Sequence, residues 1–314
     1  MNGRPVEGAL SGVRVGIVGL GTMGGALGRR LRALGGAVEG YNRGAARAAR
    51  FAADGWTVYD SPERLARGSD VVLIAVGATR DVEEVLFGER GVARGARPGT
   101  TVIDLSTIDP LASRSFAGAL GERGIRMIDA PMSGSVDAAE HGTLGFLVGG
   151  NAETVRAMTP LLETIGSHVH HFGENGAGCA AKLALNLVLA GMVQSLAEAL
   201  DVMAAGGLSQ ALFLDALDTS GLRSPAFRRV GERALHGDLR PRFALRHLHK
   251  DLCLLLRFRE RLSVQSPLAE ELGEILRAAL AERGELDYAA LIKPSGPRAA
   301  GVMFQPLSEV QTSR

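Results

Sequence analysis

Two polar side chains, Lys182 and Asn186, lie four residues apart on a segment whose other residues are mostly small or apolar. Positions i and i+4 share one face of a helix, so both side chains can reach the same substrate oxygen. An unpaired ammonium loses hydration when it leaves water, which costs free energy. A lysine on such an apolar helix therefore points to a function for its side chain. The pair predicts proton transfer to or from an oxygen. The alternative is a lysine that snorkels from a helix end.

A glycine-rich turn follows the first apolar run, residues 13–19, and opens a segment with helical periodicity. Its GxGxxG pattern permits a tight turn, close approach of the backbone to a pyrophosphate, and tight packing of helix on strand. The free N–H groups of the helix N-terminus then face the phosphates. The residues predicted to bind a dinucleotide here are Gly19, Leu20, Gly21, Thr22, Met23 and Gly24.

The end of the second predicted strand, Tyr41-Asn42-Arg43, bears on the choice of cofactor. NAD-selective sites usually hold an acid at this place, whereas a nearby arginine accommodates the 2′-phosphate of NADP. Here the strand ends without an acid, and a guanidinium fork suits a phosphate. We therefore expect Asn42 and Arg43 to contact NADP (NADPH), with NAD as the alternative cofactor.

The composition argues against several classes of function. The formal charge is +1, with 35 basic and 34 acidic residues interspersed, so we expect no nucleic-acid partner. Aromatic residues make up only 4% of the chain, too few for a base-stacking platform. Cys179 and Cys253 lie in apolar contexts and are interpreted as reduced core thiols. Without an apolar signal-peptide core, and with charges interrupting the apolar stretches, we expect a soluble cytoplasmic protein with no membrane partner.

Short β-type runs alternate with helical patterns up to about residue 172, which indicates βαβ units and a parallel sheet covered on both faces. The predicted strands are residues 13–19, 37–41, 56–59, 71–76, 101–105, 127–129, 145–148 and 168–172. Ser61-Pro62-Glu63 marks one helix start, with an N-cap, a first-turn proline and an early acid.

From about residue 178 to 205 one long apolar helix is expected, and the pattern stays helical to about residue 292. The fold class is therefore an α/β Rossmann-type doubly wound domain joined by a long helix to an all-α C-terminal domain. We divide the chain into an NADP-binding domain (1–173), an interdomain helix (174–206), an all-α substrate and dimerisation domain (207–297) and a tail (298–314).

Five motifs in order resemble those of the β-hydroxyacid dehydrogenase family, which includes 3-hydroxyisobutyrate dehydrogenases and glyoxylate/succinic semialdehyde reductases. After the glycine-rich turn come Asp104-Leu-Ser-Thr107-Ile-Asp-Pro110, Asp129-Ala-Pro-Met-Ser133-Gly134-Ser135, Gly176-x-Gly178-x-x-x-Lys182-x-x-x-Asn186 and Lys250-Asp251-Leu252. The resemblance covers nearly the whole chain. Each motif alone is modest, and the ordered set is specific.

The resemblance implies a role for each motif. The family's catalytic lysine falls on Lys182, and its hydrogen-bonding partner falls on Asn186. Its substrate-anion loop falls on Ser133, Gly134 and Ser135, whose N–H and hydroxyl groups can cradle a carboxylate. The positions matching residues that contact the cofactor are Val76, Gly77, Thr107 and Lys250.

The details favour a small carboxylate substrate. The Ser-Gly-Ser loop and Asn42-Arg43 look more like the glyoxylate/succinic semialdehyde reductase branch than the 3-hydroxyisobutyrate branch. Met132 and Val136 flank the loop without a second cation, which favours a monocarboxylate. We expect an NADPH-dependent reductase in which Lys182 is the general acid/base.

Two alternatives stay open. An imine reductase shares this architecture but generally has Asp or Tyr where Lys182 stands, and a non-catalytic NADP-binding module would have lost the lysine. A 6-phosphogluconate-type enzyme is disfavoured by Leu185, where a histidine would be needed. The apolar long helix predicts self-association, as a homodimer or homotetramer.

Some conspicuous residues receive a structural interpretation. His168, His170 and His171 lack acidic or cysteine partners at ligand spacing, so no metal site is predicted. Cys179 is interpreted as a packing residue and not as a nucleophile. The arginines at 223, 228, 229 and 233 are interpreted as a solvated helix face.

Overall fold

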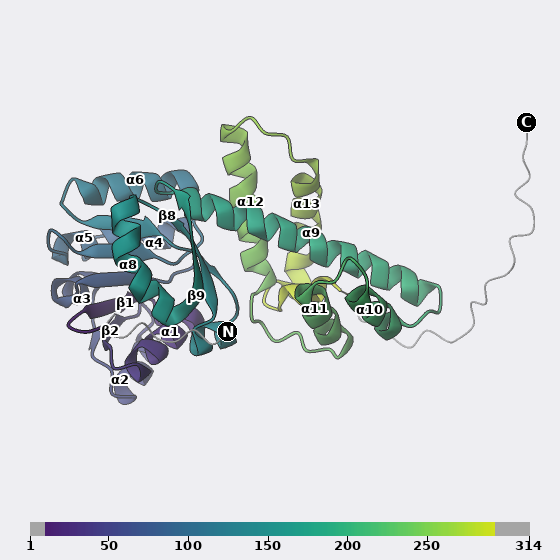
Figure 1. The fold of residues 1–314 in the computed structure, drawn as a ribbon, viewed down its shortest axis with the longest axis horizontal. Coiled ribbons are helices and arrows are strands. Elements are labelled where there is room, and N and C mark those ends of the chain that lie inside the picture. The colour runs from purple at the N-terminus through teal and green to yellow at the C-terminus, as the bar shows by residue number, and fades with distance from the viewer. Residues whose placement is uncertain (1–9, 293–314) are drawn as a thin grey trace, which may run out of the picture. The chain divides into compact units, whose positions relative to one another are not determined.

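The structure, a computed structural model, describes residues 10–292 and contains one nine-stranded sheet (Figure 1). Its strands are β1 (Arg14–Val18), β2 (Ala37–Tyr41), β3 (Val58–Tyr59), β4 (Val71–Ile74), β5 (Thr101–Asp104), β6 (Arg126–Asp129), β7 (Met132–Ser133), β8 (Leu144–Gly149) and β9 (Gly166–Gly173). The eight strands predicted from the sequence all form. The two-residue strand β7 was missed because it is too short to show a period.

Helices alternate with these strands and then replace them. In the first part they are α1 (Thr22–Ala33), α2 (Ala45–Ala53), α3 (Pro62–Gly68), α4 (Thr79–Phe87), α5 (Val92–Gly95), α6 (Pro110–Gly121), α7 (Val136–His141) and α8 (Ala152–Ile165). There follow α9 (Ala177–Ala205), α10 (Gln210–Thr219), α11 (Pro225–Leu235), α12 (Leu245–Arg261), α13 (Pro267–Arg283) and the 3₁₀ helix η1 (Tyr288–Leu291). The helix start expected at Ser61 is confirmed, because its side chain accepts a hydrogen bond from the N–H of Arg64.

The sheet runs in the order β3-β2-β1-β4-β5-β6-β8-β7, and β9 pairs with β8. Strands β1 to β6 are parallel, with Val18 of β1 opposite both Tyr41 of β2 and Ile74 of β4. Strand order reverses between β1 and β4, and crevices beside such a reversal are where doubly wound sheets bind ligands. The predicted Rossmann-type fold class is confirmed.

Two apolar cores cover the two faces of the sheet. Side chains of β1 and β4 alternate between them, as they do in a strand buried on both sides. Helices α1, α2, α7 and α8 contribute to one core, and α3, α4, α5 and α6 contribute to the other. Cys179, at the start of α9, belongs to the second core, so this helix begins as part of the sheet domain.

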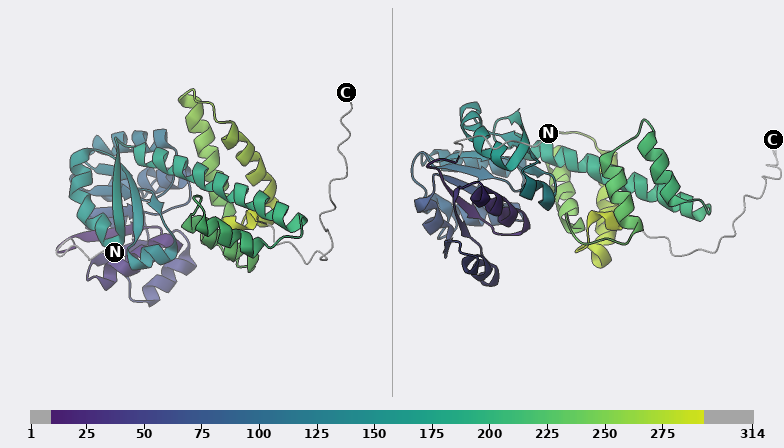
Figure 2. Two further views of the ribbon diagram at one scale, coloured as in Figure 1. Left: turned by 45° about the vertical axis from the view of Figure 1, so that its right-hand side comes forward. Right: turned by 60° about the horizontal axis from the view of Figure 1, so that its bottom comes forward.

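The chain divides into two compact units within the described residues. One comprises residues 10–185 and 254–264, and the other, the helical unit, comprises residues 186–253 and 265–292. Figure 2 shows the helices of the second unit from two more sides, with α10 and α11 packed together. Gly206, Ser220 and Pro241 lie between helices, and Pro267 is the first residue of α13. The predicted tail, 298–314, lies outside the described residues.

The N-terminus of α9 is built into the sheet domain by a buried carboxylate. The two oxygens of Asp129, at the end of β6, accept the backbone N–H groups of Gly176 (2.7 Å) and Cys179 (2.8 Å). Gly178 lies so close to β8 that a Cβ there would be 2.3 Å from the carbonyl oxygen of Leu147. The spacing Gly176-x-Gly178 is therefore a packing requirement, and it fixes the first turns of the helix.

Helix α9 is long and apolar enough to cross a membrane by length and composition, with 39% of its most apolar window buried. One face of the helix, which includes Leu183, Ala190, Val193 and Leu196, is buried. The long apolar helix expected from the sequence forms, but other positions on it reach the surface, because Val188 and Val202 are 58% and 70% exposed.

We predict that Asp129→Asn lowers the free energy of unfolding by about 1–3 kcal/mol, because an amide NH₂ then faces a buried backbone N–H that has lost its acceptor. Urea denaturation measures the change. Asp109 accepts the N–H groups of Leu111 and Ala112 as the N-cap of α6. Asp109→Asn is the matched control, since asparagine caps helices about as well as aspartate. Equal losses in the two variants would contradict the special role of Asp129.

Candidate functional site

The glycine-rich turn connects β1 to α1 at the point where the strand order reverses. Gly19 has φ of +99°, and a Cβ at this position would lie 2.3 Å from the carbonyl oxygen of Ala75. A Cβ on Gly24 would lie 2.0 Å from the carbonyl oxygen of Gly19. These two glycines are required by the protein itself, because any side chain would collide with backbone.

Gly21 differs from its neighbours, because a Cβ at this position would contact only the guanidinium of Arg47, at 3.7 Å. The open space above Gly21 fits the close approach of a pyrophosphate. Helix α1 has no side-chain cap and no acid in its first turn, so its N-terminal N–H groups suit an anion. Leu20 is fully buried and Met23 packs on the core, so their side chains point away from this space. These features fit the pyrophosphate of a dinucleotide.

Two arginines stand at the far edge of this turn. Arg43, just after β2, is 81% exposed, and its guanidinium is 3.1 Å from the carboxylate of Asp81. Asn42 shapes the loop by donating its amide N–H to the carbonyl oxygen of Gly44. Arg47, which the sequence analysis missed, places its guanidinium beside Gly21. Its position four residues after Arg43, close to the end of the second predicted strand, was the available signal.

The loops after β4 and β5 are joined by a short hydrogen-bond chain. Ser106 accepts the N–H of Val76 on its hydroxyl (3.1 Å), and its own N–H donates to Asp104 (2.9 Å). Thr79 accepts the N–H of Asp109. The predicted positions Val76, Gly77 and Thr107 thus belong to neighbouring loops at the carboxyl end of the sheet.

The predicted anion loop, Ser133 to Ser135, links β7 to α7. Gly134 has φ of +138°, and a Cβ there would lie 2.8 Å from Leu144, so glycine is required. The Ser135 hydroxyl accepts the N–H of Ala138 at 3.4 Å and serves as an N-cap. The Ser133 side chain, half-buried, makes no comparable bond among residues 10–292, which leaves it available to a ligand.

The start of α9 lies against these loops. The Cys179 thiol is 4.0 Å from the carbonyl oxygen of Ser106, and a Cβ on Gly176 would lie 2.3 Å from the carbonyl oxygen of Pro110. Lys182, half-buried, follows Cys179 by three residues on this helix. Burial, reinforced by the nearby carboxylates of Asp129 and Asp104, raises the pKa of the Cys179 thiol well above its ordinary value. Cys179 is therefore an inert packing residue.

Asn186 lies in the helical unit, where it is buried and held by one partner. Its amide nitrogen donates to Asp251 at 2.6 Å, and the carboxylate of Asp251 is 2.8 Å from the ammonium of Lys250. The Asp251 carboxylate can only accept, so it fixes the orientation of the amide. The other amide atom, Oδ1, is buried without a hydrogen-bond partner among residues 10–292. The motif Lys250-Asp251 signalled this partner, although the sequence analysis gave a role to the lysine alone.

Within the part of the chain that the structure describes, no three histidine, cysteine or acidic residues gather as metal ligands would. His168 and His170 stack on one another with their ring centres 6.1 Å apart, and the ring of His171 contacts the carbonyl oxygens of Gly150 and Gly173. These contacts account for the histidine run in β9.

Comparisons with known proteins agree with this organisation. Residues 14–173 match the family model for the NAD binding domain of 6-phosphogluconate dehydrogenase. Residues 176–295 match that for the NAD-binding domain of NADP-dependent 3-hydroxyisobutyrate dehydrogenase. The 2-(hydroxymethyl)glutarate dehydrogenase of Eubacterium barkeri is 31% identical over 90% of this chain and 94% of its own. This chain belongs to the β-hydroxyacid dehydrogenase family.

Two further relatives support the assignment to this family. Glyoxylate/succinic semialdehyde reductase 1 of Arabidopsis thaliana is 28% identical over 90% of this chain and 98% of its own. The solved structure of Mycobacterium tuberculosis 3-hydroxyisobutyrate dehydrogenase with L-serine has a TM-score of 0.81 and 30% identity, covering 89% of this chain and 98% of that chain. The present chain is therefore an NAD(P)-dependent oxidoreductase of the class that acts on CH–OH groups.

We predict that Gly21→Ala weakens nicotinamide cofactor binding by at least tenfold while thermal stability changes little. The added methyl contacts no backbone atom of the protein but occupies the space above the turn. Fluorescence titration and thermal unfolding measure the two effects. In Gly118→Ala, on α6, the new methyl meets open space and should leave binding unchanged. A Gly21 variant that binds cofactor normally would place the pyrophosphate elsewhere.

Proposed function

We propose that this dehydrogenase uses NADPH to interconvert a small carboxylate-bearing aldehyde and its hydroxyacid, with Lys182 as the general acid/base. One observation carries the proposal. Ser106 touches Val76 through its hydroxyl and Cys179 through its carbonyl oxygen. The loops expected to hold the nicotinamide therefore lie beside the start of the helix that bears the lysine.

The nicotinamide, when bound, supplies or accepts the hydride. In the reducing direction negative charge develops on the carbonyl oxygen, and the Lys182 ammonium donates a proton to it. In the oxidising direction the neutral amine of Lys182 takes the proton of the substrate hydroxyl. The rigid start of α9 serves this step, because proton transfer requires the donor and acceptor atoms to stay within hydrogen-bond distance.

Asn186 is proposed to hold the lysine or the reacting oxygen in place. It lies one helical turn beyond Lys182 on the same face, and Asp251 orients its amide so that Oδ1 can accept a further hydrogen bond. For Lys250 we keep the cofactor-binding role that the family resemblance implies. The pairing of Lys250 with Asp251 couples these two proposals, since one carboxylate serves both side chains.

The proposed substrate carries a carboxylate that binds at Ser133, Gly134 and Ser135. Relatives are named for substrates of this kind, a substituted glutarate and the glyoxylate/succinic semialdehyde pair. Met132 and Val136, on either side of the loop, pack partly against the apolar core and provide no second cation. This arrangement supports a monocarboxylate over a dicarboxylate such as the glutarate derivative.

A substrate panel separates this proposal from its rivals. NADPH oxidation is followed with glyoxylate, succinic, methylmalonate and tartronate semialdehydes, and with simple cyclic imines. Turnover of at least one carboxylated aldehyde is expected. Turnover of the imines alone would favour an imine reductase, and silence with every compound would favour a non-catalytic NADP-binding module.

Three further proposals concern the whole protein. The exposed apolar residues Val188 and Val202 of α9 support self-association as a homodimer or homotetramer. Light scattering measures the molar mass in solution. A monomer at micromolar concentration would contradict self-association. We also propose a cytoplasmic location, testable by cell fractionation. The domain boundaries 1–173, 174–206 and 207–297 are proposed as stated, and limited proteolysis should cut near residue 206, in the turn between α9 and α10.

Replacing Lys182 with alanine is predicted to lower kcat by at least about a hundredfold, because the developing oxyanion loses its proton donor. The dissociation constant for NADPH should change less than about threefold. Stopped-flow turnover and fluorescence titration measure the two quantities. Leu185→Ala, on the same helix, is the control for general damage to α9. A Lys182 variant with near-wild-type kcat would remove the lysine from the mechanism.

Arg43→Ala is predicted to weaken NADPH binding about tenfold or more and NADH binding less than about twofold, because only NADPH carries the 2′-phosphate. Arg50→Ala, which removes an equal charge from the following helix α2, should leave both affinities unchanged. Asp81→Asn should favour NADPH further, since Asp81 competes for the Arg43 guanidinium. An unchanged preference in the Arg43 variant would place the phosphate contact elsewhere.

A further inference from the structure

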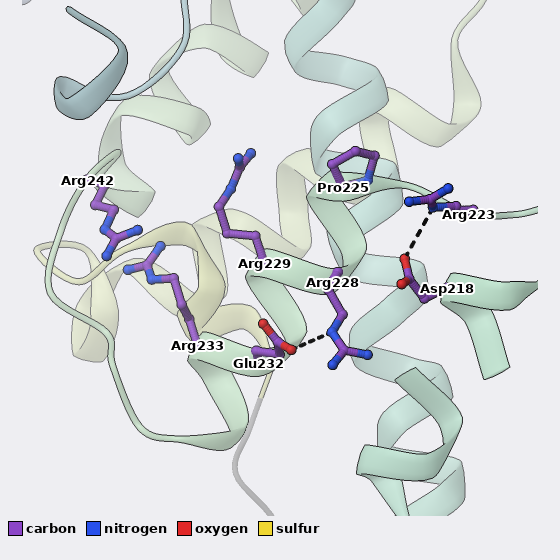
Figure 3. A pocket seen from close by; sticks show the side chains of 8 residues that line it. All are labelled: Asp218, Arg223, Pro225, Arg228, Arg229, Glu232, Arg233 and Arg242. Atoms are coloured by element: carbon purple, nitrogen blue, oxygen red, sulfur yellow. Dashed lines mark hydrogen bonds and ion pairs between the residues drawn. The ribbon is translucent and has the colours of Figure 1, made fainter. Parts of the chain in front are cut away.

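The helical unit contains a pocket of about 380 Å³ that the proposed reaction does not use (Figure 3). Its volume falls within the range of small-molecule sites, roughly 300–1,000 Å³. Five of its eight lining residues are arginines, and only two are acids. All eight lining residues belong to the helical unit, so the pocket is complete within it.

The sequence-based interpretation of these arginines as a solvated face is wrong for Arg233. Its side chain is only 10% exposed, and its guanidinium bonds to the fully buried Asp287 at 3.1 Å. Asp287 also accepts the backbone N–H groups of Arg242 (2.9 Å) and Phe243 (3.1 Å). One buried carboxylate thus fixes both Arg233 and the loop that bears Arg242. Figure 3 shows the two guanidinium groups turned toward each other.

The arginines at this end of the pocket outnumber the nearby acids. Asp238 lies 3.7 Å from both Arg233 and Arg242 and also bonds to Arg240 at 2.8 Å. The hydrogen bond and charge of Arg240, with the charge of Arg233, lower the pKa of Asp238 to about 2. Two carboxylates, those of Asp238 and the buried Asp287, therefore serve the three guanidinium groups of Arg233, Arg240 and Arg242, an arrangement that leaves positive charge uncompensated.

Arg229 adds a further charge to this end of the pocket. Within residues 10–292 it makes no hydrogen bond or ion pair, although it lines the pocket. At the other end the charges are matched, because Arg228 bonds to Asp215 and Glu232 and Arg223 lies 3.7 Å from Asp218. The uncompensated charge is therefore concentrated around Arg229, Arg233 and Arg242.

We propose that this arginine pocket binds a small polyanion, a molecule with two or more phosphate or carboxylate groups. Guanidinium forks bind both groups through paired N–H donors, and Asp287 already holds the guanidinium of Arg233 and the backbone of Arg242. Holding them in advance reduces the entropy that binding would cost. A ligand with a single carboxylate would leave part of the positive charge of the guanidinium groups without a counter-charge. We therefore propose a ligand that carries two or more anionic groups.

Isothermal titration of the full chain with citrate and with inorganic pyrophosphate tests the proposal. NADPH is kept saturating so that the glycine-rich turn is filled, and ionic strength is held constant with sodium chloride. We expect saturable binding of at least one polyanion and no measurable binding of acetate. The two arms distinguish a carboxylate ligand from a phosphate ligand.

Substitutions locate the binding. Arg229→Ala and Arg242→Ala should each raise the dissociation constant about tenfold or more, the loss expected for one charged hydrogen-bonding partner. Arg277→Ala removes an equal charge from α13, outside the pocket, where Arg277 pairs with Glu274, and should have less than a twofold effect. The proposal is overturned if neither polyanion binds, if the Arg229 and Arg242 variants bind normally, or if binding is lost only in Arg43→Ala. Because the readout is affinity and not turnover, its failure is independent of the proposed reaction.

Discussion

The buried carboxylate of Asp129 is the constraint on which the rest of the site depends. Asp129 lies at the end of β6 and accepts hydrogen bonds from the backbone N–H groups of Gly176 and Cys179 at the start of α9. Gly176 and Gly178 allow this part of the chain to approach the neighbouring backbone closely. Burial raises the pKa of this carboxyl, although the hydrogen bonds from Gly176 and Cys179 oppose the shift. Burying the Asp129 carboxyl costs free energy, and in return this group fixes the start of the helix that carries Lys182.

The other parts of the site lie close to the start of α9 that Asp129 holds. The loops after β4 and β5 meet through Ser106, and Ser106 also contacts the start of α9. The glycine-rich turn after β1 offers an open space and uncapped N–H groups beside them at the same end of the sheet. The cofactor loops and the start of α9, which carries Lys182, therefore belong to one compact unit, which suits a reaction whose hydride and proton must reach adjacent atoms of one substrate.

The sequence predicted those features that follow from local rules. Short β-type runs of three to seven residues predicted the strands, and glycine and proline marked the turns and helix starts. The residues it missed act through partners far along the chain. Asp129 bonds to residues 47 and 50 positions later, Asp251 bonds to Asn186 across 65 positions, and Asp287 fixes a loop 45 positions earlier. Spacing alone cannot encode such contacts, and for the same reason the arginine pocket was interpreted as an exposed helix face.

The central claim is that a carboxylate on the substrate is recognised at Ser133 to Ser135 while Lys182 serves the carbonyl oxygen. The most direct test compares kcat/KM for succinic semialdehyde and for butanal, which differ in the carboxylate. Losing a charged group that accepts buried hydrogen bonds should lower kcat/KM about a hundredfold or more. Equal values for the two aldehydes would contradict carboxylate recognition and, with it, the assignment of this chain as a reductase of carboxylated aldehydes.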